Sequence, residues 1–512
     1  MKKLLFIILL ILSIITLSCR DKITSPISNP IGITVNPYGL TPLSAVYTTK
    51  TVNTTSITVK VKGLYGEPDI IHTYPAGYGR EFEIHGMFPE SMNTIEVNDG
   101  GRIITKNVYV GTLSYNGNTI KKKYDVEINN LPEEKYPNNP DLYFIGNSSG
   151  AIGTYGISRN GFIRYAMLNT YHSRVAKENN NIIVYPEHNN DLKYLSGKFY
   201  VKVEINQHHD TIKVGNNYIY LANSKWGIED RLIEINKNGT LIRDLNFGTL
   251  IKDIVKANGN QQNEVDILNK IVFDENNVHQ NSSGQQIATD WCHANSLVYD
   301  SSTDILYVSS RNRGVLAIDY SEWKLIWWMA DKTLQTRVDI NSNTPVGFIP
   351  YDVHFKDLPS LEPYRVKGAG MDDGPKNQHA LFLLANGNLG MFDNQGDEDT
   401  NPNGSRYVEY KITGTHGNYT AQKVYEYRDS SLYSRITSDV DFTGENYQNI
   451  LITYGYPNGR ILEIEKNSRK ILFKLVVPYF LYRSDKMPLY YDEGRIYSED
   501  CNLKNPNYLT LI

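Results

Sequence analysis

Cysteine is scarce in this chain, which has 3 in 512 residues. Cys292 and Cys501 stand far apart in the sequence, and two thiols do not make the cross-linked framework of a small disulfide-rich domain. A surplus of one charge is also lacking, because the net charge is only −4. A nucleic-acid-binding protein carries a basic surplus against the phosphates, so we expect no nucleic-acid partner.

Long apolar runs are absent as well. A membrane-spanning helix needs roughly 18–20 apolar residues in a row, and the chain has no such run. One shorter apolar stretch, Leu4–Ile15, is broken only by Ser13 and follows Lys2 and Lys3. A basic flank before a short apolar core is typical of a secretory signal peptide, which we expect over residues 1–18.

A cysteine directly after that segment predicts how the chain is anchored. Cys19 follows the small residue Ser18, as in the cleavage box of a bacterial lipoprotein. We expect a lipid on Cys19 and a tether over residues 19–31. The protein would then be exported to the periplasm or cell envelope, with the lipid as its only membrane contact. The alternative is cleavage nearby, with Cys19 incidental.

Tyrosine dominates the aromatic residues, with 38 Tyr against 15 Phe and 5 Trp. Tyrosine favours strands, and the 38 glycines favour turns. An apolar content of 40% excludes a disordered chain, and 512 residues exceed what one compact core holds. We therefore predict an all-β fold.

The first part of the chain predicts a β-sandwich. Ile57, Val59 and Val61 alternate with polar residues, which places the apolar side chains on one face of a strand. Similar stretches, separated by Gly and Pro turns, fill residues 32–130, a suitable length for an N-terminal β-sandwich domain. We place the second domain over residues 131–512.

The second domain repeats a unit of three apolar strands joined by turns. Copies lie at residues 218–243, 305–328 and 450–473. Repeated strand–turn–strand units are typical of a β-propeller, whose blades close radially. Two long segments, 249–288 and 330–376, lack strand periodicity, and we expect them to be functional insertions.

Three histidines occupy the same place in the repeat. His209, His293 and His379 each stand just before the first apolar strand of a unit. Equivalent positions on different blades face the same end of a propeller, so the three imidazoles should converge there. Arg311 ends the strand after His293 and should face the same end.

Three imidazoles and a guanidinium predict a pocket for an oxyanion such as sulfate or phosphate. Arginine presents a planar fork of donors, and histidine serves as a nucleophile or general acid–base near neutral pH. Two alternatives stay open, namely histidines that only hydrogen-bond neighbouring strands and a zinc site built from the three histidines. We expect no metal, because the cationic Arg311 would repel one.

Several segments also carry a family resemblance, taken in chain order. They are NPYGLTPLSAV (36–46), DWCHANSLVYD with ILYVSSRNRGVLAID (290–319), NQHALFLLANGNLGMFDN (377–394), SRYVEYKI (405–412) and YSRITSDVDF (433–442). Together they resemble the bacterial arylsulfate sulfotransferases. The resemblance implies a β-sandwich followed by a six-bladed β-propeller, with sulfuryl transfer from an aryl sulfate to a phenol and no cofactor. It also allows a homodimer through the non-propeller regions.

The resemblance further implies roles for the candidate residues. His379 would be transiently sulfated in a ping-pong reaction, with His293, Arg311 and His209 as the other active-site residues. The family does not use the nucleotide donor of the cytosolic sulfotransferases, and the chain has no G-x-x-x-x-G-K-[ST] phosphate loop.

Chemistry suggests how those residues share the work. Arg311 would spread the charge on the sulfuryl oxygens, and His293 would protonate the leaving oxygen and deprotonate the acceptor. His209 would share that work or hold sulfuryl oxygens. Asn295 would bind substrate or else support its strand. An aryl sulfate hydrolase on the same site and a non-catalytic binding propeller are the alternative functions.

Overall fold

The computed structural model describes residues 29–147, 153–186, 191–201, 207–225, 227–259, 261–271, 279–280, 286–331, 346–348, 354–396, 400–444 and 446–497. The predicted signal peptide 1–18, the anchor Cys19 and most of the tether 19–31 lie outside the described residues. Within the described part, no helix has the length and apolar character needed to cross a membrane.

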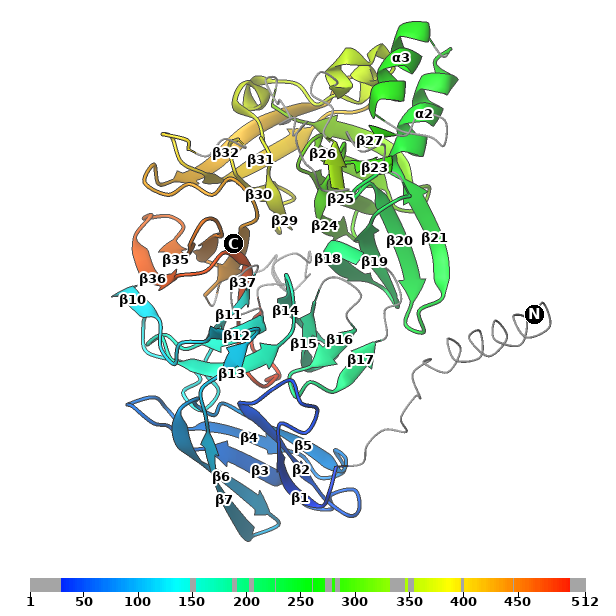
Figure 1. The fold of residues 1–512 in the computed structure, drawn as a ribbon. Helices are drawn as coiled ribbons and strands as arrows, with labels where there is room; N and C mark the ends of the chain where they lie inside the picture. Colours follow the sequence, from blue (N-terminus) through cyan, green and yellow to red (C-terminus); the bar gives the residue numbers. More distant parts are fainter. Residues whose placement is uncertain are drawn as a thin grey trace, which may run out of the picture.

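The N-terminal domain is a sandwich of two sheets (Figure 1). One sheet holds β1 (Gly32–Val35), β2 (Ser44–Thr48) and β5 (Glu81–His85), and the other holds β4 (Ile70–Tyr74), β3 (Ile57–Val61), β6 (Ser91–Asp99) and β7 (Arg102–Val110) in that order. The alternation predicted for Ile57, Val59 and Val61 is confirmed, since all three are buried and share a core with Phe82 and Ile84 of the facing sheet. A short hairpin of β8 (Ser114–Tyr115) and β9 (Asn118–Thr119) follows.

The rest of the described chain forms blade-like sheets of four or five antiparallel strands (Figure 1). From one sheet to the next they are β37 (Leu481–Met487), β11 (Leu142–Asn147), β12 (Gly153–Ile157) and β13 (Ile163–Leu168); β14 (Arg174–Glu178), β15 (Asn181–Tyr185), β16 (Leu192–Tyr194) and β17 (Phe199–Val201); β18 (Gln207–Val214), β19 (Asn217–Ala222), β20 (Arg231–Asn236) and β21 (Leu241–Asn246); β24 (Ala294–Asp300), β25 (Ile305–Ser310), β26 (Gly314–Asp319) and β27 (Lys324–Met329); β29 (His379–Leu383), β30 (Leu389–Asp393), β31 (Arg406–Thr413) and β32 (Thr420–Arg428); β33 (Asp439–Thr443), β34 (Asn449–Tyr454), β35 (Gly459–Glu465), β36 (Ile471–Val477) and β10 (Asp125–Asn129). The predicted β-propeller is thus confirmed, while the number of blades in the whole chain stays a prediction.

The ring closes by pairing the two ends of the chain. The C-terminal strand β37 pairs with β11, and β10 pairs with β36. Closure of this kind leaves few exposed sheet edges. Strand β10 lies before the boundary that we expect near residue 130, yet it completes a sheet with strands from the far end of the chain.

The first strands of the sheets contact one another around a common centre. Contacts join β18 to β24, β24 to β29, β29 to β33, β33 to β37 and β37 to β14. The repeat units recognised in the sequence correspond to the outer three strands of a sheet, such as β19–β20–β21 and β25–β26–β27. The inner strands therefore place one end of each sheet close to its neighbours.

Helices occupy part of the segment 249–288, which lacks strand periodicity and which we predicted to be a functional insertion. Helix α2 (Phe247–Ala257) begins at Asn246, whose side chain accepts a hydrogen bond from the Thr249 backbone N–H, and α3 (Gln262–Ile271) follows. The buried face of α2, which includes Leu250 and Ile251, packs against the β18–β21 and β24–β27 sheets. The all-β prediction is confirmed in that strands dominate the described chain, and an amphipathic spacing of apolar residues adds a few helices on the outside of the ring (Figure 1).

Smaller elements complete the described chain. Short strands β22 (His279–Gln280), β23 (Gln286–Thr289) and β28 (Val346–Phe348) form a sheet, and three 3-10 turns, η1 (Phe355–Asp357), η2 (Pro359–Tyr364) and η3 (Ala369–Asp373), lie in the second predicted insertion.

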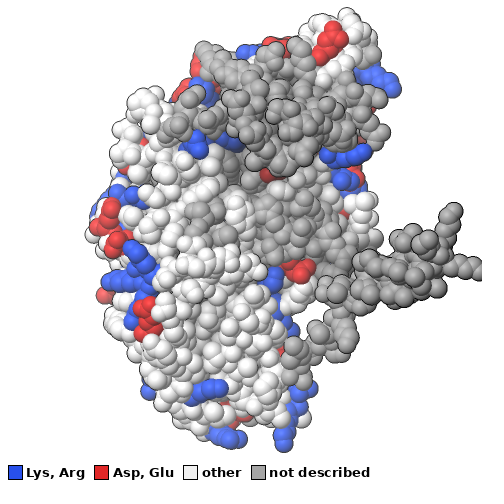
Figure 2. Space-filling model, in the orientation of Figure 1, with Lys and Arg blue, Asp and Glu red and all other residues white. Residues whose placement is uncertain are grey.

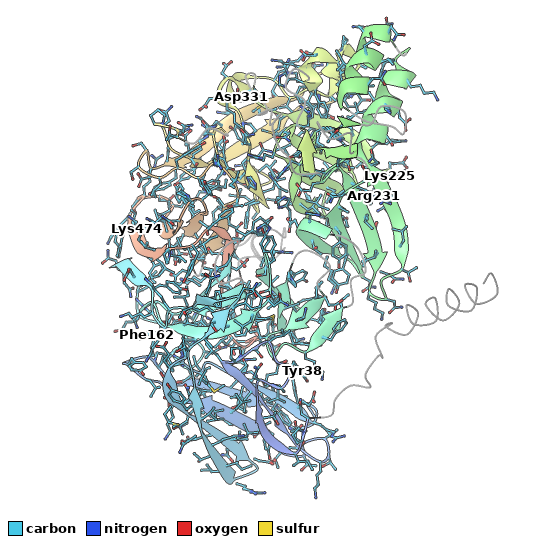
Figure 3. The ribbon with its side chains drawn as sticks, in the orientation of Figure 1. Tyr38, Phe162, Lys225, Arg231, Asp331 and Lys474 are labelled. Carbon is cyan, nitrogen blue, oxygen red and sulfur yellow. The ribbon has the colours of Figure 1, made fainter. Side chains whose placement is uncertain are left out.

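The sandwich is bound firmly to the propeller. Arg164 of β13 is fully buried, lies 3.4 Å from the Glu67 carboxylate and donates to the Gly86 carbonyl of the sandwich. Phe162 stacks on Tyr65 with ring centroids 5.4 Å apart, at the junction visible in Figure 3. On the visible face in Figure 2, acidic and basic side chains of the described residues are interspersed, in keeping with the small net charge.

Candidate active site

The predicted site residues lie at matching ends of inner strands. His209 is in β18, His293 directly precedes β24, and His379 opens β29. The strand pairing shifts register beside each of them, and φ is +55° at His209 and +54° at His293. Bulges and left-handed backbone re-aim side chains and are common at functional sites.

The three histidines come together, as the repeat predicts. The rings of His209 and His293 have centroids 5.2 Å apart. His379 is close enough for the charges of Arg311, His209 and His293 to lower its pKa. The structure thus assembles these four residues from three sheets, far apart in the sequence.

His379 is held in a single tautomer by a neighbouring amide. Its Nδ1 lies 2.8 Å from Asn394 Oδ1, and Asn394 Nδ2 donates to the carbonyls of Ser434 and Thr437. Because both amide protons are used there, the oxygen must face the histidine, so Nδ1 carries the proton. The backbone N–H of Thr437 donates to Nε2 from 3.3 Å, so Nε2 is the unprotonated nitrogen and its lone pair accepts this bond.

His379 is also kept neutral. Burial lowers its pKa well below the ordinary value, and the positive charges of Arg311, His209 and His293 lower it further, against the hydrogen bond of Asn394. Only 3% of the residue is exposed. A neutral imidazole with an unprotonated Nε2 is the form in which histidine acts as a nucleophile.

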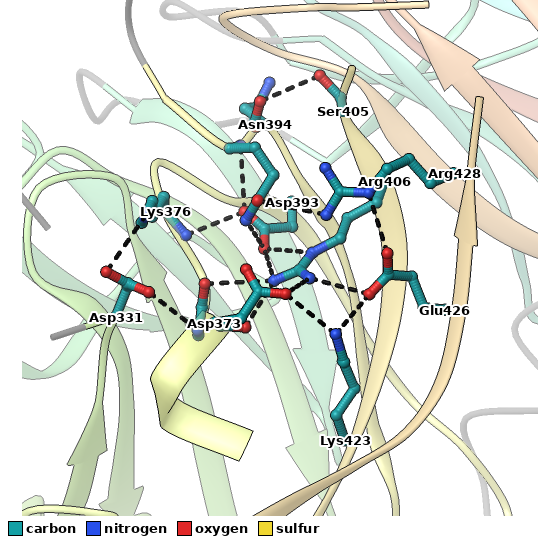
Figure 4. Close-up of polar contacts among 12 residues, drawn as sticks. Asp331, Asp373, Lys376, Asp393, Asn394, Ser405, Arg406, Lys423, Glu426 and Arg428 are labelled. Carbon is teal, nitrogen blue, oxygen red and sulfur yellow. Dashed lines mark hydrogen bonds and ion pairs between the residues drawn. The ribbon is translucent and has the colours of Figure 1, made fainter. Parts of the chain in front are cut away.

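An ionic network supports the turn that carries Asn394 (Figure 4). Arg406 is fully buried and contacts the Asp393 carboxylate at 2.8 Å, with Asp373 and Glu426 at its other side. Asp393 immediately precedes Asn394, and the Ser405 hydroxyl donates to the Asn394 carbonyl. The network therefore fixes the end of β30 behind His379.

The charges around His293 have the opposite effect from those around His379. Burial lowers its pKa, but the nearby carboxylates of Asp290 and Glu229 outweigh burial and the charge of Arg311, so the pKa is raised overall. Its Nδ1 lies 2.9 Å from Asp290 Oδ2, and its Nε2 lies 3.3 Å from Glu229 Oε2. His293 is thus suited to carry a proton at neutral pH and to donate it from Nε2.

Arg311 is tied through its backbone to His293 and to the segment before His379. Its backbone N–H donates to the His293 carbonyl at 2.9 Å, and its carbonyl accepts from the side chain of Asn377, two residues before His379. The residue is 8% exposed. A guanidinium in this position suits a sulfuryl group, whose oxygens match its donor fork.

His209 has a polar neighbour at each ring nitrogen. The Tyr482 hydroxyl donates to the carbonyl of His209, so its oxygen accepts from Nδ1, 3.0 Å away. The Nε2 atom lies 2.9 Å from Glu229 Oε1. A cleft beside His209 is lined by Arg174, Tyr185, Pro186, His208, Asp210 and Thr211.

Asn295 ties two inner strands together. Its amide nitrogen donates to the Gln378 carbonyl at 2.9 Å, and its own carbonyl accepts from Arg483. Asn295 is fully buried. It therefore anchors the backbone next to His379, and its predicted contact with substrate stays a prediction.

Sequence reasoning missed Glu229, which contacts three histidines. Besides His209 and His293, its carboxylate lies 3.3 Å from Nδ1 of His208. Glu229 is one of 56 acidic residues and stands in a turn before β20. No spacing pattern marks it, because its partners come from other inner strands.

Two clusters within the described residues have side chains of the types that bind metals. They are His209–Glu229–His293 and Asp439–Asp441–Asp485. The first differs from the zinc site considered from the sequence, because Glu229 stands where His379 was expected. Arg311 acts on the same histidines as a positive charge, which opposes a divalent cation, and we assign no metal ligand.

Comparison with curated proteins shows two related enzymes. The chain is 25% identical over 282 residues to the arylsulfate sulfotransferase AssT of Escherichia coli O6:H1, a match that covers 49% of this chain and 45% of the relative. It is 26% identical over 285 residues to AssT of Lelliottia amnigena, with the same coverage. The chain thus matches less than half the length of each relative.

Solved structures give weaker similarities. The β-propeller domain of Cps50 (Swd1) from Myceliophteria thermophila aligns with a TM-score of 0.34 and 10% identity, covering 71% of this chain and 89% of that one. BamB from Moraxella catarrhalis aligns with a TM-score of 0.26 and 10% identity, covering 78% and 87%.

Family profiles match both domains. The arylsulfotransferase Ig-like domain matches residues 32–111, within the sandwich. The arylsulfotransferase (ASST) profile matches residues 129–487, which is more than half of the chain and contains the whole constellation around His379. The chain therefore belongs to the arylsulfotransferase family.

Proposed function

We propose that this protein transfers a sulfuryl group from an aryl sulfate to a phenol through a sulfohistidine on His379. The observation that carries the proposal is the state of His379, which Asn394 holds with Nδ1 protonated and which burial keeps neutral. Family membership supports the same class of reaction. A ping-pong mechanism follows from a nucleophile that keeps the group between two half-reactions.

In the first half-reaction, Nε2 of His379 attacks sulfur and the bond from sulfur to the aryl oxygen breaks. The electron pair of that bond goes to the aryl oxygen, which takes the proton from Nε2 of His293 and leaves as a phenol. Arg311 stabilises the charge on the sulfuryl oxygens, and one such donor is worth about 3–4 kcal/mol. His379 keeps its Nδ1 proton on Asn394 throughout.

In the second half-reaction, the acceptor phenol enters the vacated place. Its proton moves to Nε2 of His293, its oxygen attacks sulfur, and the bond from sulfur to Nε2 of His379 breaks. The electron pair returns to Nε2 and regenerates the neutral imidazole. General acid–base catalysis by a positioned histidine contributes roughly 10²–10⁴-fold.

The test is release of 4-nitrophenol from 4-nitrophenyl sulfate by the purified chain, with and without phenol. We expect phenol to stimulate release, phenyl sulfate to form in equal amount, and both to vanish in His379→Asn. Release that ignores phenol would identify a hydrolase with water as the acceptor. Unchanged activity in the variant would refute the assignment of His379.

A further inference from the structure

We propose that Glu229 is a positioning residue that holds His209 and His293 from the side of their Nε2 atoms and keeps a proton on Nε2 of His293. The inference deepens the proposed function and rests on it. It assigns the proton needed by the leaving phenol to His293, which shares one buried carboxylate with His209.

The contacts of Glu229 are divided between its two oxygens. Oε1 lies 2.9 Å from Nε2 of His209, and Oε2 lies 3.3 Å from Nε2 of His293. Glu229 is 4% exposed. A buried carboxylate is costly unless it is paired, so in the unliganded site it favours a proton on Nε2 of His293.

The other nitrogen of each ring is held by a separate partner. Nδ1 of His293 faces the Asp290 carboxylate, and Nδ1 of His209 faces the Tyr482 hydroxyl. Each imidazole therefore has a polar partner near both ring nitrogens, with Glu229 as the shared one. Partners on both sides of an imidazole set its orientation.

The backbone around Glu229 is tied to the segment that carries His293. The Glu229 N–H donates to the Asn223 side chain, and its carbonyl accepts from the backbone of Ala294 at 2.9 Å. The next residue, Asp230, accepts a hydrogen bond from the Trp291 indole at 3.0 Å. With φ at +50°, the turn projects the Glu229 carboxylate between β18 and β24.

Several charged or titratable groups act on this carboxylate and its two histidines. They are His208 from β18, Asp290 before β24, Arg311 after β25 and His172 before β14. Nε2 of His208 faces the Asn223 amide, which donates, so Nδ1 of His208 also donates to Glu229. These contacts leave Glu229 as the carboxylate shared by Nε2 of His209 and Nε2 of His293.

The test compares two donors in wild type and Glu229→Gln. Phenolate is a strong base and needs a proton as it leaves, whereas 4-nitrophenolate is a weak base and does not. We expect turnover of phenyl sulfate to fall roughly 10–100-fold and turnover of 4-nitrophenyl sulfate to fall far less. Loss of the carboxylate lowers the pKa of His293. As pH rises, the variant should therefore lose activity on phenyl sulfate at a pH about one unit lower than wild type does.

Two further variants separate positioning from a structural role. Glu234→Gln removes another buried carboxylate, one that contacts Asn217, Arg243 and Tyr320 and no site histidine. We expect Glu234→Gln to leave unchanged both the ratio of turnover on the two donors and the pH profile of activity. Glu229→Asp, which keeps the charge, should restore part of the pH profile.

A measurement independent of turnover completes the test. In protein labelled with ¹³C at histidine Cε1, NMR titration should show a lower pKa for His293 in Glu229→Gln than in wild type. Equal losses of turnover on both donors, together with an unchanged pKa of His293, would overturn the proposal. An inactive wild type would instead contradict the proposed function, and the titration would still decide the role of Glu229.

Discussion

At the scale of single residues, the site works by giving chemically similar side chains different surroundings. His379 faces an amide oxygen and its pKa is lowered, whereas His293 faces two carboxylates and its pKa is raised. Separated pKa values of this kind divide a nucleophile from an acid–base. The sequence predicts which histidines meet, but not these differences, because Asn394 and Glu229 carry no distinguishing pattern.

Replacement of Asn394 tests the tautomer of His379. Asn394→Leu removes the acceptor at Nδ1, so the ring can place its proton on Nε2 and lose the nucleophilic lone pair. We expect kcat to fall roughly 10–100-fold with KM little changed, the usual scale for loss of an orienting partner. Steady-state kinetics on 4-nitrophenyl sulfate measure this, and unchanged kcat at normal thermal stability would contradict the account.

At the scale of elements, the outer strands could be predicted and the inner strands could not. Units such as 305–328 match β25, β26 and β27, because β25 and β26 are almost entirely buried and mostly apolar. Inner strands such as β18 and β33 carry polar residues toward the centre, which hides their periodicity. Helix α2 was not predicted for a different reason. Its apolar residues have helical spacing, but the segment that contains it was recognised only by its lack of strand periodicity.

The Arg406 network gives a prediction for element stability. Arg406→Met leaves Asp393, which is fully buried, without its cation. Breaking a buried pair from one side costs about 3–5 kcal/mol, which urea denaturation measures. Adding Asp393→Asn should recover much of the loss. A single variant as stable as wild type would show that the network does not support β30.

At the scale of the whole molecule, the sandwich packs against the propeller through buried residues. Strands from distant parts of the chain pair to close the propeller ring. Sequence patterns predict a sandwich and a propeller, yet the pairings β11–β37 and β10–β36 join residues more than half the chain apart. No local pattern reports such contacts. The family resemblance added only the expected number of blades to the architecture that the patterns predict.

The boundary also predicts a pH dependence of stability. His72 of the sandwich stacks on Tyr490 at 4.4 Å, and burial is the main cause that lowers its pKa from 6.5 to about 4. Between those values the unfolded chain binds a proton that the folded chain does not, so stability falls as pH falls from 6.5 toward 4. His72→Phe should reduce the drop in Tm between pH 7 and pH 5. A drop as large as in wild type would contradict this assignment.

The most direct test of the central claim is to trap the intermediate. The chain is incubated with 4-nitrophenyl sulfate without acceptor, quenched under mildly alkaline conditions and analysed by peptide mass spectrometry. We predict one added SO₃ group on His379, its disappearance when phenol is added before the quench, and no adduct in His379→Asn. An adduct on another residue, or sulfuryl transfer to phenol with no adduct at any time, would contradict the account.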